Sequence, residues 1–259
     1  MEEQPDASRG LPPAGGAPLP PVEADRVSLA GAMVGLLTEP TATFKRLAAR
    51  PTWTCLVPLV LALVLGAAGY YVFTQRADMK EFMRSEIRNS PFASQMDEKQ
   101  IEEATQQAAD RPPWFMVGTI PVVGAIMMAI IAGVFWVAIL AFGDHIPFKY
   151  AFQVVCWAQV PAILGTILFI VIINVKDPTF IDLKNPIMTN LGAVLGRDRL
   201  GKPLYALLSD LDLFSFWKLW LEAAGFAAFA KARAGKMLAI VFGIYGLYVL
   251  GHMALAAIF

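Results

Sequence analysis

Three ionisable residues lie within or beside one apolar segment in the C-terminal third of the chain. Asp212, Lys218 and Glu222 fall in a stretch that is otherwise rich in Leu, Phe and Trp. Lys218 and Glu222 are four residues apart, so a helix places both on one face. If the segment begins near Leu211, Glu222 lies about 15 Å along it at a rise of ~1.5 Å per residue. A carboxylate at that depth in an apolar layer needs a cationic partner or a proton.

Two roles fit the Lys218 and Glu222 pair. The first is a structural ion pair inside a helical bundle, which we take as the primary interpretation. The second is a relay that passes protons or a substrate through the apolar layer.

A second apolar segment carries three uncharged polar residues, Gln153, Gln159 and Asn174. The six-residue step from Gln153 to Gln159 places them on opposing flanks of one helix, so that one could face a partner helix and the other a cavity. Hydrogen bonds between helices are the simpler role for all three. Together with Asp212, Lys218 and Glu222 they form our candidate intramembrane polar site.

The remaining reactive residue types form no catalytic pattern. His145 follows Asp144 in a short turn, and His252 is isolated in an apolar segment. The sequence contains no HExxH or CxxC motif, no phosphate-binding loop, no nucleophile elbow and no dinucleotide fingerprint. Cys55 and Cys156 lie in or beside apolar segments, where free buried thiols are expected. The sequence therefore predicts no enzyme, no cofactor and no metal site.

Long apolar segments dominate the chain. Hydrophobic residues make up 57% of the 259 residues and charged residues only 16%, below the ~25% charged residues of typical soluble domains. The segment from Phe115 to Phe142 contains no charge, although about 20 helical residues suffice to cross a bilayer. We predict an all-α membrane protein, a bundle of five transmembrane helices, with spans at Cys55–Phe73, Phe115–Phe142, Ala151–Val175, Leu211–Ala230 and Met237–Phe259.

The N-terminal region precedes these spans. Residues 1–27 are rich in Pro, Ala and Gly without an apolar core, which predicts a disordered tail rather than a signal peptide. From Ser28 to Arg50 the apolar residues fall at helical spacing, and Pro40 restarts the helix. Phe44 and Leu47 form a stripe opposite basic residues, which predicts an amphipathic helix on an anionic lipid surface. A short connector is the alternative.

Basic residues flank the spans at two places and supply the candidate contacts with lipid headgroups. Both groups fall on one side if the spans alternate, and cations in short flanks favour the cytoplasmic side. We therefore predict a cytoplasmic N-terminus and an outside C-terminus. The formal net charge is zero, so nucleic acid is not an expected partner. The six basic residues that are candidates for contact with lipid headgroups are Lys45, Arg46, Arg50, Lys231, Arg233 and Lys236.

Two long connections lie on the other side. Residues 74–114 carry apolar residues at helical spacing among mixed charges, and Asp97 is placed to begin a helix. Residues 176–210 are punctuated by prolines and end in an apolar turn from Leu204 to Leu208. We expect both connections to cover the outer end of the bundle, with their charges on a solvated face.

Short motifs recur in a set order along the chain. They are Glu39-Pro40-Thr-x-Thr43-Phe44, Phe148-Lys149-x-Ala151, Cys156-x-Ala158-x-x-Pro161, Asn185-Pro186, Asn190-Leu191 and Leu211-Asp212-Leu213-Phe214-x-x-Trp217 with Leu221 and Gly225. In this order the chain, from about Leu36 to Phe259, resembles the YIP family of five-pass membrane proteins named for interaction with Ypt/Rab GTPases, and its bacterial members more than the eukaryotic ones.

The resemblance implies five spans, a cytosolic N-terminus and a non-catalytic role in membrane traffic or organisation. The Pro/Ala-rich tail does not match the eukaryotic cytosolic domain that meets GTPases, so a Rab-type GTPase is not among the expected partners. The expected partners are membrane lipids and other membrane proteins or a second copy. We therefore expect a bacterial inner-membrane protein that organises or assists a larger assembly; a small transporter, channel or lipid-translocating protein is the alternative.

Overall fold

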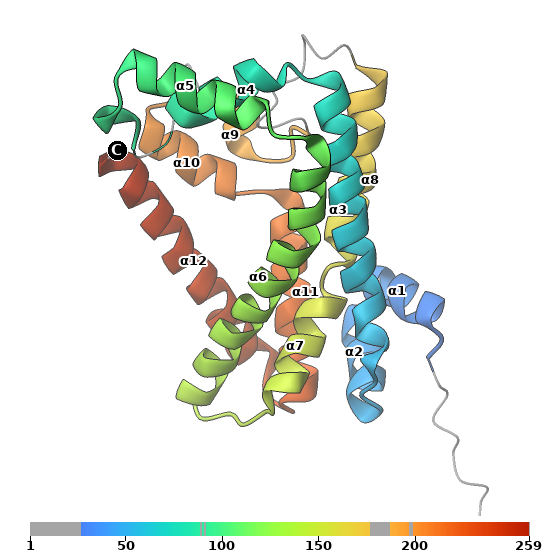
Figure 1. The fold of residues 1–259 in the computed structure, drawn as a ribbon. Helices are drawn as coiled ribbons and strands as arrows, with labels where there is room; N and C mark the ends of the chain where they lie inside the picture. The colour runs from blue at the N-terminus through green and yellow to red at the C-terminus, as the bar shows by residue number, and fades with distance from the viewer. Residues whose placement is uncertain (1–26, 89, 91, 177–186, 197–198, 259) are drawn as a thin grey trace, which may run out of the picture.

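The computed structural model describes residues 27–88, 90, 92–176, 187–196 and 199–258 (Figure 1). Within these ranges the chain is helical and forms no strand, with one isolated antiparallel bridge between Asn190 and Asp212. The predicted tail lies outside the described residues except for Val27, and so does part of the second long connection.

Two short helices form the N-terminal hairpin. Helix α1 (Leu29–Thr38) is capped by the Ser28 side chain, which accepts a hydrogen bond from the Gly31 amide at 3.0 Å. Helix α2 (Pro40–Ala49) begins at Pro40, where the missing amide hydrogen has no helical partner to lose. The predicted restart of the helix at this proline is confirmed.

Four described helical stretches are long and apolar enough to cross a membrane: Trp53–Arg76, Val117–Ala141, Phe148–Val175 and Ala234–Ile258. They correspond to η1 (Trp53–Cys55) with α3 (Leu56–Arg76), to α6 (Pro113–Ala141), to α7 (Phe148–Trp157) with α8 (Val160–Val175), and to α12 (Ala234–Ile258). The predicted span Leu211–Ala230 becomes α11 (Leu213–Phe229), which has 17 residues and falls short of the usual ~20. A fifth span is therefore not confirmed by helix length.

The third predicted span is broken in its middle. Helix α7 ends at Trp157 and α8 begins at Val160, with Pro161 in its first turn. Because proline has no amide hydrogen and clashes with the preceding turn, the break falls just before it. The predicted placement of Gln153 and Gln159 on opposing flanks of one continuous helix is therefore wrong, because the first helix ends before Gln159.

The described parts of both long connections lie at one end of the bundle (Figure 1), as predicted, and the apolar turn predicted from Leu204 to Leu208 lies within a helix. Helices α4 (Met79–Arg88), α5 (Glu98–Ala109), α9 (Leu191–Leu195) and α10 (Lys202–Asp210), with the single turn η2 (Ala93–Gln95), lie near the C-terminal end of α12 (Figure 1). Asp97 caps α5, and its side chain accepts a hydrogen bond from the Gln100 amide at 2.7 Å. We call this end of the molecule the α4–α5 end.

The α4–α5 hairpin should lose protection as the pH falls. Lys80 Nζ lies 2.8 Å from Glu102 Oε1, and its hydrogen bond and charge hold the pKa of Glu102 below its ordinary value. A carboxyl group whose pKa is lower in the folded state stabilises the fold at pH values above its unfolded-state pKa of ~4.3. This stabilisation is lost as the pH falls through the folded-state pKa. The amide-exchange protection factors of α5 should decrease when the pH is lowered below about 4. Glu102→Gln should reduce this dependence; an unchanged pH profile would contradict the prediction.

The α1–α2 hairpin packs against the helical bundle. Leu36, Phe44 and Leu47 are buried in one core cluster with Cys156 and Leu221. The apolar stripe of α2 therefore packs on protein, chiefly on α11, and its predicted position on a lipid surface is not confirmed. An apolar stripe reveals that a face is buried and does not identify what buries it.

Gly225 on α11 permits the close packing of α2 against α11. A Cβ atom added there would lie 2.6 Å from Val154 Cγ1 and 2.9 Å from Phe44 Cε1. We expect Gly225→Ala to lower the free energy of unfolding by about 1–3 kcal/mol through overpacking. The matched control is Gly133→Ala on α6, where an added Cβ meets no described atom within 4 Å; it should raise stability by up to ~1 kcal/mol. Equal effects in detergent unfolding measurements would contradict the prediction.

Candidate intramembrane polar site

One face of α11 carries a row of polar residues, Asp212, Ser215, Lys218 and Glu222, which we call the α11 polar track. Steps of three, three and four residues keep the row on one side of a helix. Asp212 caps the helix, because its Oδ2 accepts the Ser215 amide at 2.8 Å. Thr189 Oγ1 donates to Asp212 Oδ1 at 2.5 Å. The Asp212 side chain is therefore held in place by hydrogen bonds, and the α11 polar track extends from it into the bundle.

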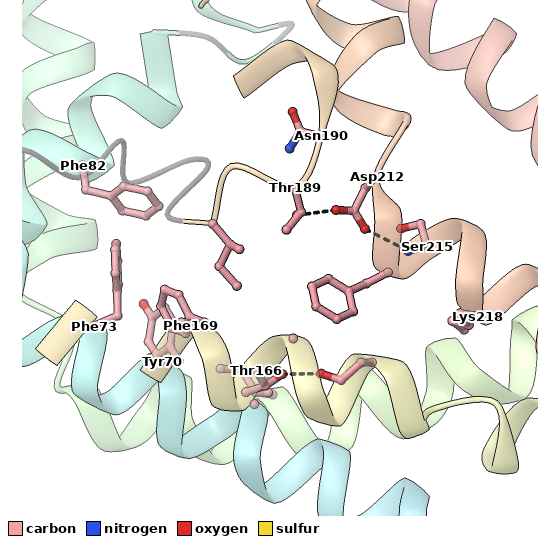
Figure 2. A pocket seen from close by; sticks show the side chains of 16 residues that line it. Tyr70, Phe73, Phe82, Thr166, Phe169, Thr189, Asn190, Asp212, Ser215 and Lys218 are labelled. Carbon is pink, nitrogen blue, oxygen red and sulfur yellow. Dashed lines mark hydrogen bonds between the residues drawn. The ribbon is translucent and has the colours of Figure 1, made fainter. Parts of the chain in front are cut away.

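A cavity of about 740 Å³ lies on one side of the track. Figure 2 shows aromatic side chains of α3, α4 and α8 at one end and Thr189, Asp212, Ser215 and Lys218 toward the other. We call it the aromatic cavity, after Tyr70, Phe73, Phe82 and Phe169. One end is thus apolar and the other polar, which suits an amphipathic molecule better than a small ion.

A second cavity of about 440 Å³ lies between α6, α11 and α12. Its walls are mostly apolar, and its polar lining comprises Ser215, Lys218 and Glu222 from α11 with Tyr245 and Tyr248 from α12. In Figure 1, α12 diverges from α6 toward the C-terminus, so we call it the fork cavity. Lys218 and Ser215 line both cavities.

Lys218 and Glu222 form a loose pair. Lys218 Nζ is 3.8 Å from Glu222 Oε1, beyond hydrogen-bond length. The Glu222 side chain is 1% exposed and that of Lys218 is 21% exposed. Within the described chain, Glu222 Oε1 accepts no hydrogen bond. The predicted proximity of the two residues is therefore present, and it leaves a buried carboxylate oxygen without a donor.

The other predicted polar residues lie elsewhere. Gln159 sits at the break between α7 and α8, where its amide donates to the Val155 carbonyl at 2.9 Å. Asn174 is exposed at the end of α8 and accepts from Arg76 at 3.3 Å. Gln153 is buried in α7. None of the three is among the described residues that line the two cavities, so the structure separates them from the α11 residues of the predicted site.

Two polar contacts at the α4–α5 end could not be read from the sequence. His252 Nδ1 lies 2.7 Å from Asp210 Oδ2, and the Tyr245 hydroxyl donates to the Asp210 carbonyl. These contacts hold α10 against α12, although 42 residues separate Asp210 from His252 in the chain. His252, which is isolated in sequence, is thus paired in space.

The predicted lipid-contacting cations differ in their surroundings. Lys236 Nζ lies 2.6 Å from Asp144 Oδ2 and donates to the Phe142 carbonyl, so it joins the α6–α7 connection to the first turn of α12. Arg46 lies 3.8 Å from Glu39. The other four side chains of the set are exposed: Lys45, Arg50, Lys231 and Arg233.

Cys55 and Cys156 are free and buried, and both lie in the core cluster that also contains Phe44 and Leu221. Their shared position in the core was not predicted, because 100 residues of chain with an intervening span separate the two. Among the described residues, no group of three His, Cys, Asp or Glu could hold a metal ion.

Comparison with known families settles the relationship of this bundle to other proteins. The sequence matches the Yip1 domain over residues 34–258. The chain belongs to the Yip1 family. No curated protein and no solved structure matches it.

The structure brings separate parts of the Yip1 domain into contact. The bridge between Asn190 and Asp212 joins the motif in the second long connection to the motif that begins α11. Phe44 of the first motif lies against Gly225 of the last.

Proposed function

We propose that this Yip1 protein is a non-catalytic membrane protein that organises or assists a larger assembly by binding other membrane helices. The observation that carries the proposal is an uncovered face on α12. Gly243 and Gly246 lie on one side of this helix, and an added Cβ at either would meet no described atom within 4 Å. Leu247 and Leu250 beside them are 72% and 55% exposed. Small residues on an open membrane-facing helix favour close approach of a second helix.

The assembly we propose lies in a bacterial inner membrane. Helix α11 also crosses the membrane and, as the fourth span along the chain, brings the total to five. The N-terminus is then cytoplasmic and the C-terminus outside. The C-terminus lies at the α4–α5 end and α2 toward the other end of the bundle (Figure 1), which is the arrangement that five alternating spans require. Reporter fusions after Arg50, Arg111, Lys149, Lys202, Lys236 and Phe259 test it, because both termini on one side would rule it out.

The partner surface is tested by affinity purification from native membranes in mild detergent. We expect stoichiometric companions, or a second copy, with the wild-type chain and their loss with Gly243→Leu combined with Gly246→Leu. Gly133→Leu on α6 is the matched control, since its added side chain also meets open space. A wild-type protein that purifies alone, or equal retention of companions by both variants, would refute the proposed surface.

A second candidate function rests on the α11 polar track. Its polar groups run from Asp212 to Glu222 beside two cavities, which favours a small transporter, channel or lipid-translocating protein. Flux of ions and of labelled lipids is measured with the purified chain in liposomes. Flux that Glu222→Gln abolishes and Glu103→Gln on the exposed face of α5 retains would favour this candidate; the absence of flux would exclude it.

A further inference from the structure

We propose that the fork cavity binds a phospholipid whose headgroup carries both a phosphate and a primary ammonium group. The ammonium lies at Glu222, the phosphate lies at Lys218, and an acyl chain leaves between α6 and α12. The inference deepens the second candidate function by naming the class of lipid. It requires that the lipid binds but does not depend on transbilayer movement. A failure of the binding proposal can therefore be distinguished from a failure to observe flux.

The fork cavity is open toward the acyl chains of the bilayer. Met127 and Val134 on its α6 wall are 45% and 48% exposed, and Tyr248 on its α12 wall is 58% exposed. Both helices are apolar enough to lie in hydrocarbon, where exposed side chains contact lipid. A molecule therefore reaches this cavity from within the membrane, and its apolar part can stay there.

The polar side of the cavity contains a carboxylate oxygen that no described hydrogen-bond donor reaches. Glu222 is almost wholly buried, its Oε1 accepts no hydrogen bond from the described residues, and Lys218 Nζ is 3.8 Å away. A pair built only for stability would close this gap, because an unsatisfied buried charge is costly. A donor entering the cavity would satisfy the carboxylate.

The charges of the site select the headgroup. Lys218 and Glu222 present one positive and one negative charge at the edge of a mostly apolar cavity. A zwitterionic headgroup matches both charges, and its primary ammonium donates N–H hydrogen bonds that a trimethylated ammonium cannot. An anionic headgroup without an amine satisfies Lys218 and leaves Glu222 beside a second negative charge. A cavity of about 440 Å³ falls within the ~300–1,000 Å³ range of small-molecule sites.

Binding is measured by native mass spectrometry on the delipidated wild-type chain in detergent. Phosphatidylethanolamine, phosphatidylcholine and phosphatidylglycerol with identical acyl chains are titrated separately. We expect phosphatidylethanolamine adducts at about tenfold lower lipid concentration than either of the others, since a charge-assisted hydrogen bond contributes enough for a tenfold change. Equal binding of the three lipids would overturn the proposal.

Variants assign the two ends of the headgroup. Glu222→Gln should remove the preference for phosphatidylethanolamine over phosphatidylcholine. Lys218→Met should weaken both lipids and keep their order, because it removes the contact with the phosphate they share. The control Glu103→Gln, on the exposed face of α5, should match the wild type. A preference that survives Glu222→Gln would overturn the proposal.

A second measurement needs no variant and remains decisive if Glu222→Gln does not fold. Phosphatidylethanolamine is compared with its N-methyl and N,N-dimethyl derivatives and with phosphatidylcholine on the wild-type chain. We expect the tighter binding to persist while one N–H remains and to fall at the trimethylated lipid. Equal binding across the series would overturn the proposal, whatever liposome flux or α12 partner binding shows.

Discussion

Replacing Phe44 with Ala is expected to lower the free energy of unfolding by about 3–5 kcal/mol, the range for truncating a buried aromatic side chain. Phe44 is 0% exposed and lies in the core cluster that joins α1 and α2 to α3, α7 and α11. Because its ring also contacts the position of Gly225, the cavity would lie where the hairpin meets the bundle. Unfolding of the detergent-solubilised protein by denaturant measures the loss.

Phe92→Ala supplies the control for Phe44→Ala. Phe92 is 67% exposed, so its truncation should change stability by no more than ~0.5 kcal/mol. A loss from Phe44→Ala as small as that of Phe92→Ala would contradict the packing of α2 on α11. It would favour instead a hairpin held on the lipid surface, as the amphipathic pattern of α2 first indicated.

Replacing Lys218 with Met is expected to destabilise the protein by about 3–5 kcal/mol, because it leaves Glu222 as an uncompensated buried carboxylate. The double variant Lys218→Met with Glu222→Leu should recover most of this loss, since apolar residues of similar size can replace a buried ion pair at little cost. A double-mutant cycle in detergent measures the coupling between the two positions.

Lys99 and Glu103 on α5 provide a matched control pair. They share the i,i+4 spacing, and their charges are 3.7 Å apart, but their side chains are 84% and 68% exposed. Their cycle should give only about 0.3–0.5 kcal/mol. If the buried pair couples no more strongly than the exposed one, Lys218 does not compensate the charge of Glu222.

The sequence by itself determined the long apolar helices and where several helices begin. Apolar length predicted α3, α6 and α12, because a long segment without charges has few stable states other than a membrane helix. Asp97 and Pro40 marked helix starts, because capping and proline geometry act within one turn of the chain. The i,i+4 relation of Lys218 and Glu222 was equally local.

Only the tertiary structure decided what each face meets. The stripe of α2 packs against α11, the third span breaks before Pro161, and Asp210 pairs with His252 across two helices. Gln153, Gln159 and Asn174 were grouped by type with the α11 residues, yet they lie away from both cavities. Hydropathy records that a side chain avoids water, and lipid and protein satisfy that preference equally well. The choice between them, and with it the two cavities beside Lys218, depends on contacts between residues far apart in the chain.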